Sequence, residues 1–486
     1  MSSYFIKTGR LFTPVRKYAW LFTLLVGIGG LWYPRLGLLV IPVMLSLVIM
    51  AFFRGRYWCG NFCAHGSLFD SLLPLSRNSK IPAFFKAKIV VGGFFLWFTF
   101  NLTRKFIRVW SLSGTGAFWD RLGMIFVSSY LMVIIAGVLL SLFVTPRTWC
   151  NFCPMGVLQR LSSKLGKLLG VARKTDVKVS ITSSKLCHKC GKCARVCPMQ
   201  LLPYAEFPEH NQFTAENCIK CATCVENCPA GILYIGPEQE AAAKSARTDE
   251  SGADGRRRIT ARVAAVKELK PDVREYTFQF LEPEKISYKP GQFLLLKIQD
   301  NPEMFRAYTI SSYCTDGRSA GIIVKKVKDG YGTEMIFNNV KAGDVVELEG
   351  PLGNSLQVDK KAARLLFVAN GIGITPFIPL VYDVLEKGSA ARDVTLVYGV
   401  RHENDFIYDE YFRELAAKHP RFRYLKVVSR PEDPQVRKGY VTNVVEELAL
   451  TGYKTYICGS KAMTADMLQV LRKLGYDEED IFYEAV

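Results

Sequence analysis

Eight of the fourteen cysteines in this chain fall into two copies of one spacing, which constrains the fold more than any other feature. Each copy reads Cys-x2-Cys-x2-Cys-x3-Cys-Pro, and the two begin about thirty residues apart. Four cysteines at these intervals are typical ligands of a [4Fe–4S] cluster. A disulfide framework or a zinc site would require a different arrangement of cysteines. The segment is therefore predicted to bind two [4Fe–4S] clusters and to carry single electrons.

The two runs resemble those of bacterial two-cluster ferredoxins, which implies a ferredoxin domain over residues 176–235. In that family the fourth cysteine of each run binds the cluster of the other run. One cluster would then be held by Cys187, Cys190, Cys193 and Cys228. The second would be held by Cys218, Cys221, Cys224 and Cys197.

Basic residues and long apolar runs are concentrated in the first third of the chain. Residues 1–175 contain 21 of the 63 Lys and Arg but only two of the 44 Asp and Glu, so they carry the whole net charge of +19. The apolar runs are Tyr18–Tyr33, Leu36–Phe53, Phe84–Leu102 and Leu122–Thr145. A spanning helix needs about 20 mainly apolar residues. We therefore expect a transmembrane domain of four helices over residues 1–175, with buried core helices of a soluble domain as the alternative.

The basic clusters predict how these helices are oriented. Lys and Arg precede the first run and follow the second and fourth runs, and such loops face the cytoplasm. The cluster Arg104–Arg108 lies on the opposite side. We expect a multi-pass protein of the cytoplasmic membrane, with its redox domains on the cytoplasmic side. Beside spanning helices, the positive charge indicates contact with anionic membrane lipid and not with nucleic acid.

The membrane segment contains an internal repeat. Arg-x-Trp-Cys followed by Asn-Phe-Cys occurs at residues 56–63 and again at residues 147–153. Two helix pairs related by duplication would build a site at their interface. This site is a possible third iron–sulfur cluster, and its ligands would be Cys59, Cys63, Cys150 and Cys153. The alternative is four reduced structural thiols. A bis-histidine haem lacks a second ligand, because His65 is the only histidine of this region.

Residues 15–235 resemble the polyferredoxin membrane proteins that support periplasmic nitrate and nitrous-oxide reductases. The resemblance rests on the two tryptophan–cysteine loops followed by a ferredoxin module. It implies electron exchange with the membrane, through a quinone or a membrane redox partner.

The second half of the chain has a different pattern. Residues 236–257 are polar and small, which is typical of a linker. Six short alternating segments then predict an antiparallel, flavin-binding β-barrel over residues 258–360. From residue 361 to 486, buried strands alternate with helical patterns and predict a doubly wound α/β nucleotide-binding domain. Gly371 and Gly373 would let the backbone approach a pyrophosphate at a helix N-terminus.

Four motifs of this half resemble, in the same order, those of the ferredoxin–NADP reductase superfamily. They are Arg306–Ser311, Gly330–Thr333, Gly371–Pro376 and Cys458–Ser460. The resemblance implies FAD as a cofactor and NADH or NADPH as a partner. The residues that it implies for cofactor binding are Arg306, Tyr308, Thr309, Gly332, Thr333, Gly371, Gly373, Thr375, Cys458 and Gly459.

The same resemblance implies a catalytic set around the point of hydride transfer. Arg306 would neutralise the flavin phosphate, Tyr308 would stack on the isoalloxazine, and Thr309 would hydrogen-bond near flavin N5. Cys458 would lie against the nicotinamide C4, and Glu484 would shape the geometry of transfer. Ordinary packing or surface roles are the alternative for each residue.

The order of the modules predicts a membrane-bound oxidoreductase that passes electrons from NAD(P)H through FAD and the [4Fe–4S] clusters to a membrane acceptor. A membrane-tethered ferredoxin–NAD(P) oxidoreductase, with a soluble ferredoxin as donor, is the first alternative. A non-catalytic electron-relay subunit is the second. Arg401 is compatible with NADPH and with NADH, and NADH is slightly favoured. Neither the direction of electron flow nor the oligomeric state follows from the residues.

Overall fold

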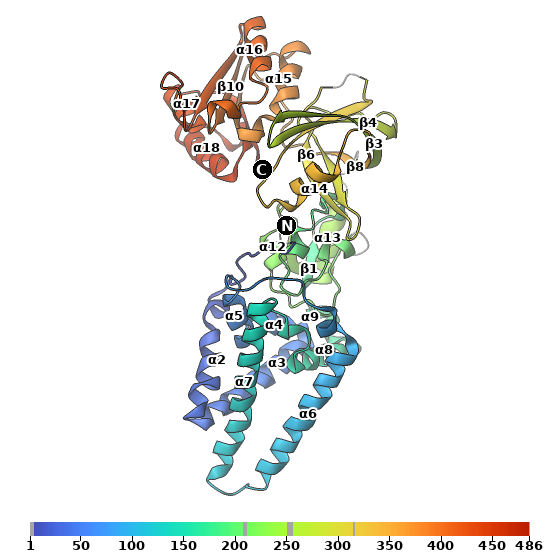
Figure 1. The fold of residues 1–486 in the computed structure, drawn as a ribbon, viewed down its shortest axis with the longest axis vertical. Coiled ribbons are helices and arrows are strands. Elements are labelled where there is room, and N and C mark those ends of the chain that lie inside the picture. The colour runs from blue at the N-terminus through green and yellow to red at the C-terminus, as the bar shows by residue number, and fades with distance from the viewer. Residues whose placement is uncertain (1–3, 208–210, 250–255, 314–315, 486) are drawn as a thin grey trace. The chain divides into compact units, whose positions relative to one another are not determined.

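The structure is a computed structural model that describes residues 4–207, 211–249, 256–313 and 316–485. The chain divides into two compact units, with the boundary at residues 252 and 253 (Figure 1). The N-terminal unit holds the long helices and the cysteine runs, and the C-terminal unit holds the two large sheets. Each unit has a hydrophobic core of its own.

Helices make up most of residues 14–175. Their bounds are α1 Pro14–Tyr18, α2 Trp20–Gly27, α3 Val40–Arg54, α4 Tyr57–Asn61, α5 Ala64–Ser71, α6 Lys88–Trp110, α7 Ala117–Phe143, α8 Pro154–Leu168 and α9 Val171–Thr175. α6 and α7 form the long hairpin in the lower part of Figure 1. α3 packs against α8, and α2 packs against α5 and α7. Short helices α4, α5 and α8 therefore gather at one end of the long ones.

Two of the four predicted apolar runs form helical segments that are long and apolar enough to cross a membrane. These segments are Pro34–Arg54 and Ala117–Phe143. The third predicted run lies within α6, which has 23 residues. α6 is long enough to cross a membrane, but it is not among the segments that are also apolar enough, because Arg104 and Lys105 lower its mean hydropathy.

The first predicted run, Tyr18–Tyr33, does not form one spanning helix, and this part of the prediction was wrong. α2 ends at Gly27, and a 3-10 turn follows at Gly29–Leu31. The turn contains Gly29 and Gly30, and glycine is a poor helix former. α2 also packs closely on α7, since a Cβ added to Gly27 would lie 2.4 Å from Cδ1 of Ile134. The segment folds back against α7 where a side chain would have kept it away.

The cysteine runs lie in a small α/β segment of the N-terminal unit. Strand β1 (Lys178–Ile181) pairs antiparallel with β2 (Leu233–Gly236). Between them lie the one-turn helices α10 Lys192–Arg195, α11 Pro203–Glu206 and α12 Thr223–Glu226. The predicted linker over 236–257 begins instead with helix α13, Glu238–Asp249. Its Ala, Glu, Gln and Lys residues are strong helix formers. The last part of the predicted linker, residues 250–255, lies outside the described residues.

A six-stranded antiparallel sheet begins the C-terminal unit, as predicted. Its order is β6-β5-β8-β3-β4-β7. The bounds are β3 Arg257–Lys270, β4 Val273–Glu282, β5 Phe293–Gln299, β6 Met304–Thr309, β7 Ser319–Lys325 and β8 Val345–Leu352. Helix α14 (Tyr331–Asn339) follows β7. Inward-facing Val, Ile, Leu and Phe side chains of these strands fill one core.

A five-stranded parallel sheet completes the unit, in the order β11-β10-β9-β12-β13. The strands are β9 Arg364–Asn370, β10 Asp393–Val400, β11 Phe422–Val428, β12 Lys454–Gly459 and β13 Ile481–Ala485. The helices are α15 Phe377–Glu386, α16 Asp409–Lys418, α17 Val441–Glu447 and α18 Lys461–Lys473. The chain order reverses between β9 and β12, and ligands of doubly wound sheets bind outside the carboxyl ends of the strands at such a point. Both Gly371–Pro376 and Cys458–Ser460 begin there.

Candidate redox sites

Arg306 and the start of α14 form the first candidate site, on the antiparallel sheet. Arg306 lies on β6, opposite Leu296 of β5. A Cβ added to Gly332 would lie 2.5 Å from Nε of Arg306, so only glycine lets the guanidinium cross the first turn of α14. The Thr333 hydroxyl donates to the carbonyl oxygen of Gly330 at 3.1 Å and accepts from the amide of Val327 at 3.1 Å. A guanidinium beside a helix N-terminus favours a phosphate.

Tyr308 and Thr309 end the same strand. Tyr308 packs its ring against the barrel core, and burial raises the pKa of its phenol above the usual value. The hydroxyl is therefore neutral, and the half-buried ring offers a flat apolar face. Thr309 lies opposite Phe293 in the β5–β6 register.

The glycine loop after β9 lies against the end of β12. A Cβ added to Gly373 would lie 2.2 Å from the carbonyl oxygen of Cys458, so the loop needs glycine at this position. Asn370 Oδ1 accepts from the amide of Ser460 at 3.1 Å. The Thr375 hydroxyl donates to the carbonyl oxygen of Ile372 at 2.8 Å. Two motifs that are more than eighty residues apart in the sequence therefore meet as the resemblance implied.

Cys458 and Glu484 are direct neighbours in the β12–β13 register. Burial raises the pKa of the Cys458 thiol to about 12, and the carboxylate of Glu484 adds to the shift. Burial also raises the pKa of Glu484, against a hydrogen bond from Ser355. Cys458 is therefore a neutral thiol and not a nucleophile. A Cβ added to Gly353 would lie 2.8 Å from Phe293 and 3.9 Å from Oε1 of Glu484, which places this loop between the barrel strands and Glu484.

Two cavities open at the carboxyl ends of the parallel strands. One of about 510 Å³ is lined by Asn370, Gly371 and His402, and another of about 330 Å³ is lined by Ser429 and Tyr440. Arg401 borders both, and Arg430 borders the second. Sequence reasoning missed Arg430 and Tyr440, because they follow β11 and belong to no motif.

The loops around the ferredoxin cysteines repeat their backbone geometry. Left-handed backbone conformations occur at the same three positions of each run, namely Lys189, Gly191 and Gln200, then Lys220, Ala222 and Gly231. Such turns direct amide N–H groups inward, where they form anion-binding nests. The amide of Lys189 lies 3.4 Å from Sγ of Cys187, and that of Leu201 lies 3.5 Å from Sγ of Cys197.

The ferredoxin thiols lie close to one another, and their division into two ligand sets stays a prediction. Burial raises the pKa of Cys193, and so do the neighbouring Cys190 and Cys187. Cys228 packs in a buried cluster with Cys187 and Cys193, and the same cluster contains Cys218 and Cys224 of the other predicted set. In the other group, burial raises the pKa of Cys224, and the next contributions come from Cys221, Cys218 and Cys197.

This donor set fits iron–sulfur clusters and not a single ion. Buried thiols that repel each other as thiolates need cations among them, and the irons of a cluster supply those. Among the described residues, no three His, Cys, Asp or Glu side chains converge closely enough to hold one metal ion. A cluster binds each cysteine through a different iron and so keeps its ligands further apart.

The repeat cysteines also converge. Cys59, Cys63, Cys150 and Cys153 line one cavity of about 240 Å³ at the ends of α3 and α7. Burial raises the pKa of Cys153 to about 12, with further contributions from Cys150 and Cys59. The Sγ of Cys63 accepts from the amide of Gly66 at 3.4 Å, and that of Cys59 accepts from Gln159 Nε2 at 3.0 Å.

The arginines of the repeat cross between its halves. Arg56 donates to the carbonyl oxygen of Cys150 at 2.9 Å, and Arg147 donates to that of Cys59 at 3.0 Å. A Cβ at Gly156 would lie 2.9 Å from Arg56, and one at Gly66 would lie 2.3 Å from Arg147. Each half therefore anchors the cysteine loop of the other.

The second ferredoxin site abuts the repeat. Cys221 lies in one buried apolar cluster with Cys59, Cys150 and Ile219, against which Cys197 packs. A Cβ added to Gly60 would lie 2.0 Å from the carbonyl oxygen of Ile219 and 3.1 Å from Cα of Cys221. Sequence spacing did not predict this contact.

Comparison with known proteins agrees with the geometry of the C-terminal unit. Residues 260–356 match the family described as oxidoreductase FAD-binding domain, and residues 367–469 match oxidoreductase NAD-binding domain. The ferredoxin–NAD(P)+ reductase component of the naphthalene 1,2-dioxygenase system of Pseudomonas putida is 31% identical over 230 residues, which are 47% of this chain and 68% of the relative. The chain belongs to the ferredoxin–NADP reductase superfamily.

Other members of the superfamily match over a similar span. The toluate 1,2-dioxygenase electron transfer component of Pseudomonas putida is 28% identical over 246 residues, which are 50% of this chain and 70% of the relative. Among solved structures, a cytochrome P450 reductase of Amycolatopsis matches at 25% identity with a TM-score of 0.43, covering 47% of this chain and 70% of the other.

The cysteine-containing segments match iron–sulfur families as well. Residues 186–233 match the 4Fe-4S dicluster domain, and residues 36–82 and 126–172 match the 4Fe-4S binding domain. The latter two stretches each contain one cysteine pair of the repeat. The protein is thus an electron-transfer oxidoreductase that combines an FAD- and NAD(P)H-binding reductase with ferredoxin domains, and its cofactors are FAD, NAD(P)H and two [4Fe–4S] clusters.

Proposed function

We propose that this protein is a multi-pass membrane oxidoreductase that passes electrons from NAD(P)H through FAD and iron–sulfur clusters to an acceptor in the membrane. The observation that carries the proposal is the buried cluster in which Cys221 of the ferredoxin packs with Cys59 and Cys150 of the repeat. It joins a ferredoxin site to a cysteine site at the ends of apolar helices.

The exposure of the long helices supports a membrane location. Only 22% and 28% of the most apolar stretches of Pro34–Arg54 and Ala117–Phe143 are buried, which is not the pattern of core helices in a soluble protein. Ile89, Leu96 and Phe100 of α6 are 89%, 68% and 62% exposed. Apolar side chains so arranged suit contact with lipid. The basic loops beside the cysteines support a location of the redox domains on the cytoplasmic side.

The four repeat cysteines are proposed to hold a third [4Fe–4S] cluster. Their convergence on one cavity and the match of both repeat halves to the 4Fe-4S binding domain support this assignment. Each cluster contains four irons, so purified protein should contain about twelve irons per chain. A value of about eight would leave the four cysteines as structural thiols.

The proposed electron route follows from which cysteines are neighbours. When bound, FAD accepts two electrons as a hydride and can release them one at a time. The clusters relay single electrons. The site of Cys218, Cys221, Cys224 and Cys197 would be the relay nearest to the membrane, since Cys221 packs against the repeat. The site of Cys187, Cys190, Cys193 and Cys228 would then be the one that exchanges electrons with the reductase unit.

In the reductase unit, the proposed work of the protein residues is binding and orientation. Arg306 and the N-terminus of α14 would bind the flavin phosphates, and Tyr308 would orient the ring through its flat face. Thr309 would donate a hydrogen bond near flavin N5. Cys458, a neutral thiol, would present a small uncharged surface to the nicotinamide. Glu484 would shape the same pocket without a fixed negative charge, because burial favours its protonated form.

The cavity that the repeat cysteines line also extends between apolar side chains, and this part of it suits a quinone as the acceptor next to the proposed third cluster. Phe22, Met44 and Phe98 give the cavity apolar walls. His65 also lines it, and the imidazole Nε2 of His65 is buried without a hydrogen-bond partner among the described residues. A quinone ring would fill apolar space of this kind, and its carbonyl oxygen would accept a hydrogen bond from the imidazole.

NADPH is proposed as the preferred coenzyme, although the sequence slightly favoured NADH. Arg401 and Arg430 line the same cavity at the ends of β10 and β11. Two guanidiniums at this edge of a doubly wound sheet favour a 2′-phosphate. Stopped-flow reduction of the flavin by each coenzyme tests this, and Arg430→Ala should weaken binding of NADPH but not of NADH.

The function is tested with the full chain in lipid nanodiscs under anaerobic conditions. We expect NAD(P)H oxidation to be stimulated by a short-chain quinone, and Cys59→Ser to abolish this stimulation while electron transfer to ferricyanide continues. Stimulation by a soluble ferredoxin but by no quinone would instead support a membrane-tethered ferredoxin–NAD(P) oxidoreductase. The FAD- and NAD-binding domains argue against a relay subunit without catalysis.

A further inference from the structure

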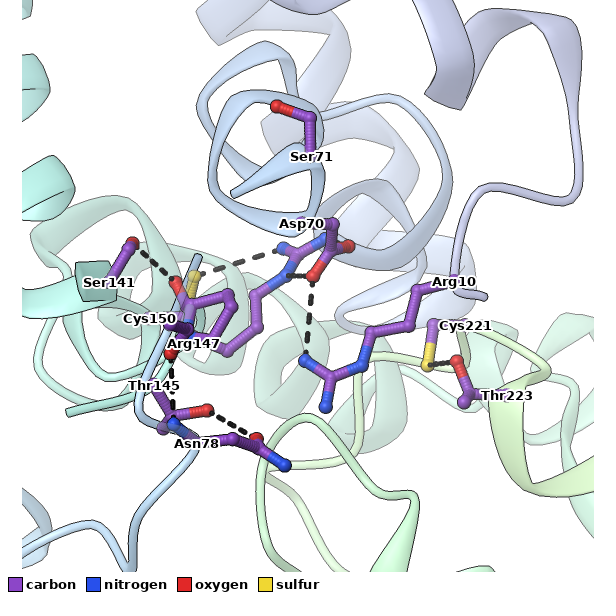
Figure 2. Close-up of polar contacts among 12 residues, drawn as sticks. Arg10, Asp70, Ser71, Asn78, Ser141, Thr145, Arg147, Cys150, Cys221 and Thr223 are labelled. Carbon is purple, nitrogen blue, oxygen red and sulfur yellow. Dashed lines mark hydrogen bonds and ion pairs between the residues drawn. The ribbon is translucent and has the colours of Figure 1, made fainter. Parts of the chain in front are cut away.

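A buried charge cluster lies between the repeat cysteines and the second ferredoxin site (Figure 2). It consists of the carboxylate of Asp70 and the guanidiniums of Arg10, Arg16 and Arg147, here called the Asp70 network, whose side chains are at most 4% exposed. Arg16 Nη2 donates to Asp70 Oδ2 at 2.9 Å. Arg147 donates to the same carboxylate through Nη2 at 2.6 Å and Nε at 3.1 Å. Arg10 Nη1 lies 3.8 Å from Oδ1.

At one end the network meets the repeat cysteines. Arg147 Nη1 donates to the carbonyl oxygen of Cys59 at 3.0 Å and lies 3.8 Å from Sγ of Cys150. Figure 2 shows Arg147 extended between Asp70 and Cys150. The guanidinium thus borders the proposed third cluster on one side and its counter-ion on the other.

At the other end the network meets the ferredoxin. Arg16 Nη1 donates to the carbonyl oxygen of Cys221 at 3.1 Å. Arg10 interacts electrostatically with Cys221 and with Cys197, which come from different runs but belong to one predicted ligand set. One connected group of buried charges therefore borders two cluster sites.

Arg56 adds a further buried charge at the repeat. It is 2% exposed, and its Nη2 donates to the carbonyl oxygen of Cys150 at 2.9 Å and lies 3.9 Å from Sγ of Cys59. Nη1 donates to the carbonyl oxygen of Asn217 at 3.4 Å. Within the part of the chain that the structure describes, no carboxylate pairs with Arg56, whereas Asp70 pairs with Arg147.

The positive charge in this region is therefore in excess. Three buried arginines share the one carboxylate of Asp70, and within the described ranges Arg56 has none. The Nε atoms of Arg10, Arg16 and Arg56 have no hydrogen-bond partner among the described residues. A buried charge without a counter-ion is costly. A cluster bound by four thiolates carries net negative charge and exposes sulfur acceptors, so clusters at the two sites would supply both the missing charge and the missing acceptors.

We propose that the Asp70 network and Arg56 are positioning residues that set the reduction potentials of the third cluster and of the adjacent ferredoxin cluster together. The inference rests on the third cluster of the proposed function. Each electron added to a cluster adds negative charge, so nearby buried arginines stabilise the reduced form and raise its potential. Asp70 opposes this effect at both sites, and its shared position keeps the two potentials matched for transfer between them.

The test is an EPR-monitored potentiometric titration of the full chain in lipid nanodiscs. Arg56→Gln should lower the potential of the third cluster, whereas Arg10→Gln should act mainly on the ferredoxin cluster of Cys221. Asp70→Asn should raise both. At a fixed poise we expect roughly a tenfold change in the ratio of reduced to oxidised cluster, which corresponds to about 59 mV for one electron.

Two controls separate charge from folding. Arg56→Lys keeps the charge and should leave the potential close to that of the wild type. Arg35→Gln removes an exposed arginine, 66% accessible and paired with Asp120, and should change neither potential. The proposal is overturned if Arg56→Gln retains its iron and its potential is unmoved or raised, or if Asp70→Asn lowers either potential. About eight irons per chain in the wild type would instead refute the third cluster itself.

Discussion

Asp70 is expected to be indispensable to the stability of the N-terminal unit, although it is one of only two acids in residues 1–175. Its side chain is fully buried and serves three arginines. Removing one partner of a buried ion pair costs about 3–5 kcal/mol, because the other charge remains buried and unpaired. Asp70→Ala leaves three buried guanidiniums without their carboxylate, so we expect a loss of stability in the upper part of this range.

The other acid, Asp120, provides a matched control. It accepts from Arg35 Nε at 2.8 Å, but the two side chains are 46% and 66% exposed. Exposed pairs of this kind contribute about 0–1 kcal/mol. In a unit of about 250 residues, 1 kcal/mol shifts the melting temperature by about 2–4 °C. At about 4–5 kcal/mol, Asp70→Ala should therefore lower it by roughly 8–20 °C, and Asp120→Ala should lower it by about 4 °C at most.

The assay is thermal unfolding of the full chain in lipid nanodiscs, followed by the loss of iron–sulfur absorption. Flavin fluorescence reports the reductase unit in the same sample, and its transition should not move in either variant. If Asp70→Ala and Asp120→Ala shift the iron–sulfur transition equally, burial of the Asp70 network is not what stabilises this unit.

Three further predictions follow from single contacts. Gly60→Ala should slow electron transfer from the ferredoxin to the repeat but not flavin reduction, because its Cβ would lie 2.0 Å from the carbonyl oxygen of Ile219; Gly92→Ala, with nothing within 4 Å, is the control in the same stopped-flow experiment. Gly332→Ala should weaken FAD binding by about 1–3 kcal/mol, measured as flavin retained after dialysis. Burial raises the pKa of Glu484 above its ordinary value of 4.5, so ionisation of this carboxyl group opposes folding. As the pH rises from 4.5 through the raised pKa, the melting temperature of the wild-type reductase unit should fall relative to that of the Glu484→Gln variant. Parallel curves of melting temperature against pH for the two proteins would contradict this.

The parts of the fold that the sequence predicted are those in which chemistry fixes residues at short range. The spacing of the ferredoxin cysteines indicated a two-cluster domain, because three cysteines of each run must reach the same cluster at short fixed intervals. The order of the four reductase motifs indicated which loops would meet, as the contact between Gly373 and Cys458 shows. In both cases the ligand imposes the local geometry, so a short sequence pattern is enough to indicate the binding loop.

The parts that the sequence did not predict depend on relations between distant segments. Hydropathy identified Tyr18–Tyr33 as apolar, but it does not report that the helix ends at Gly27 and that this residue packs closely on α7. The polar composition of residues 236–257 suggested a linker, and the helix propensity of Glu238–Asp249 was the overlooked signal. The internal repeat predicted that its two halves face each other, but it did not predict that Arg56 and Arg147 each donate to the cysteine loop of the opposite half.

These long-range contacts decide whether the ferredoxin is a shuttle or a fixed relay. A domain that moves between partners needs a small and polar interface. Here Arg16 donates to the carbonyl oxygen of Cys221, Lys220 donates to the carbonyl oxygen of Arg54 at 2.7 Å, and Gly60 lies against the backbone of Ile219. These buried contacts would all have to break for the second cluster site to leave the repeat. The ferredoxin is therefore expected to remain on the helical segment through the catalytic cycle.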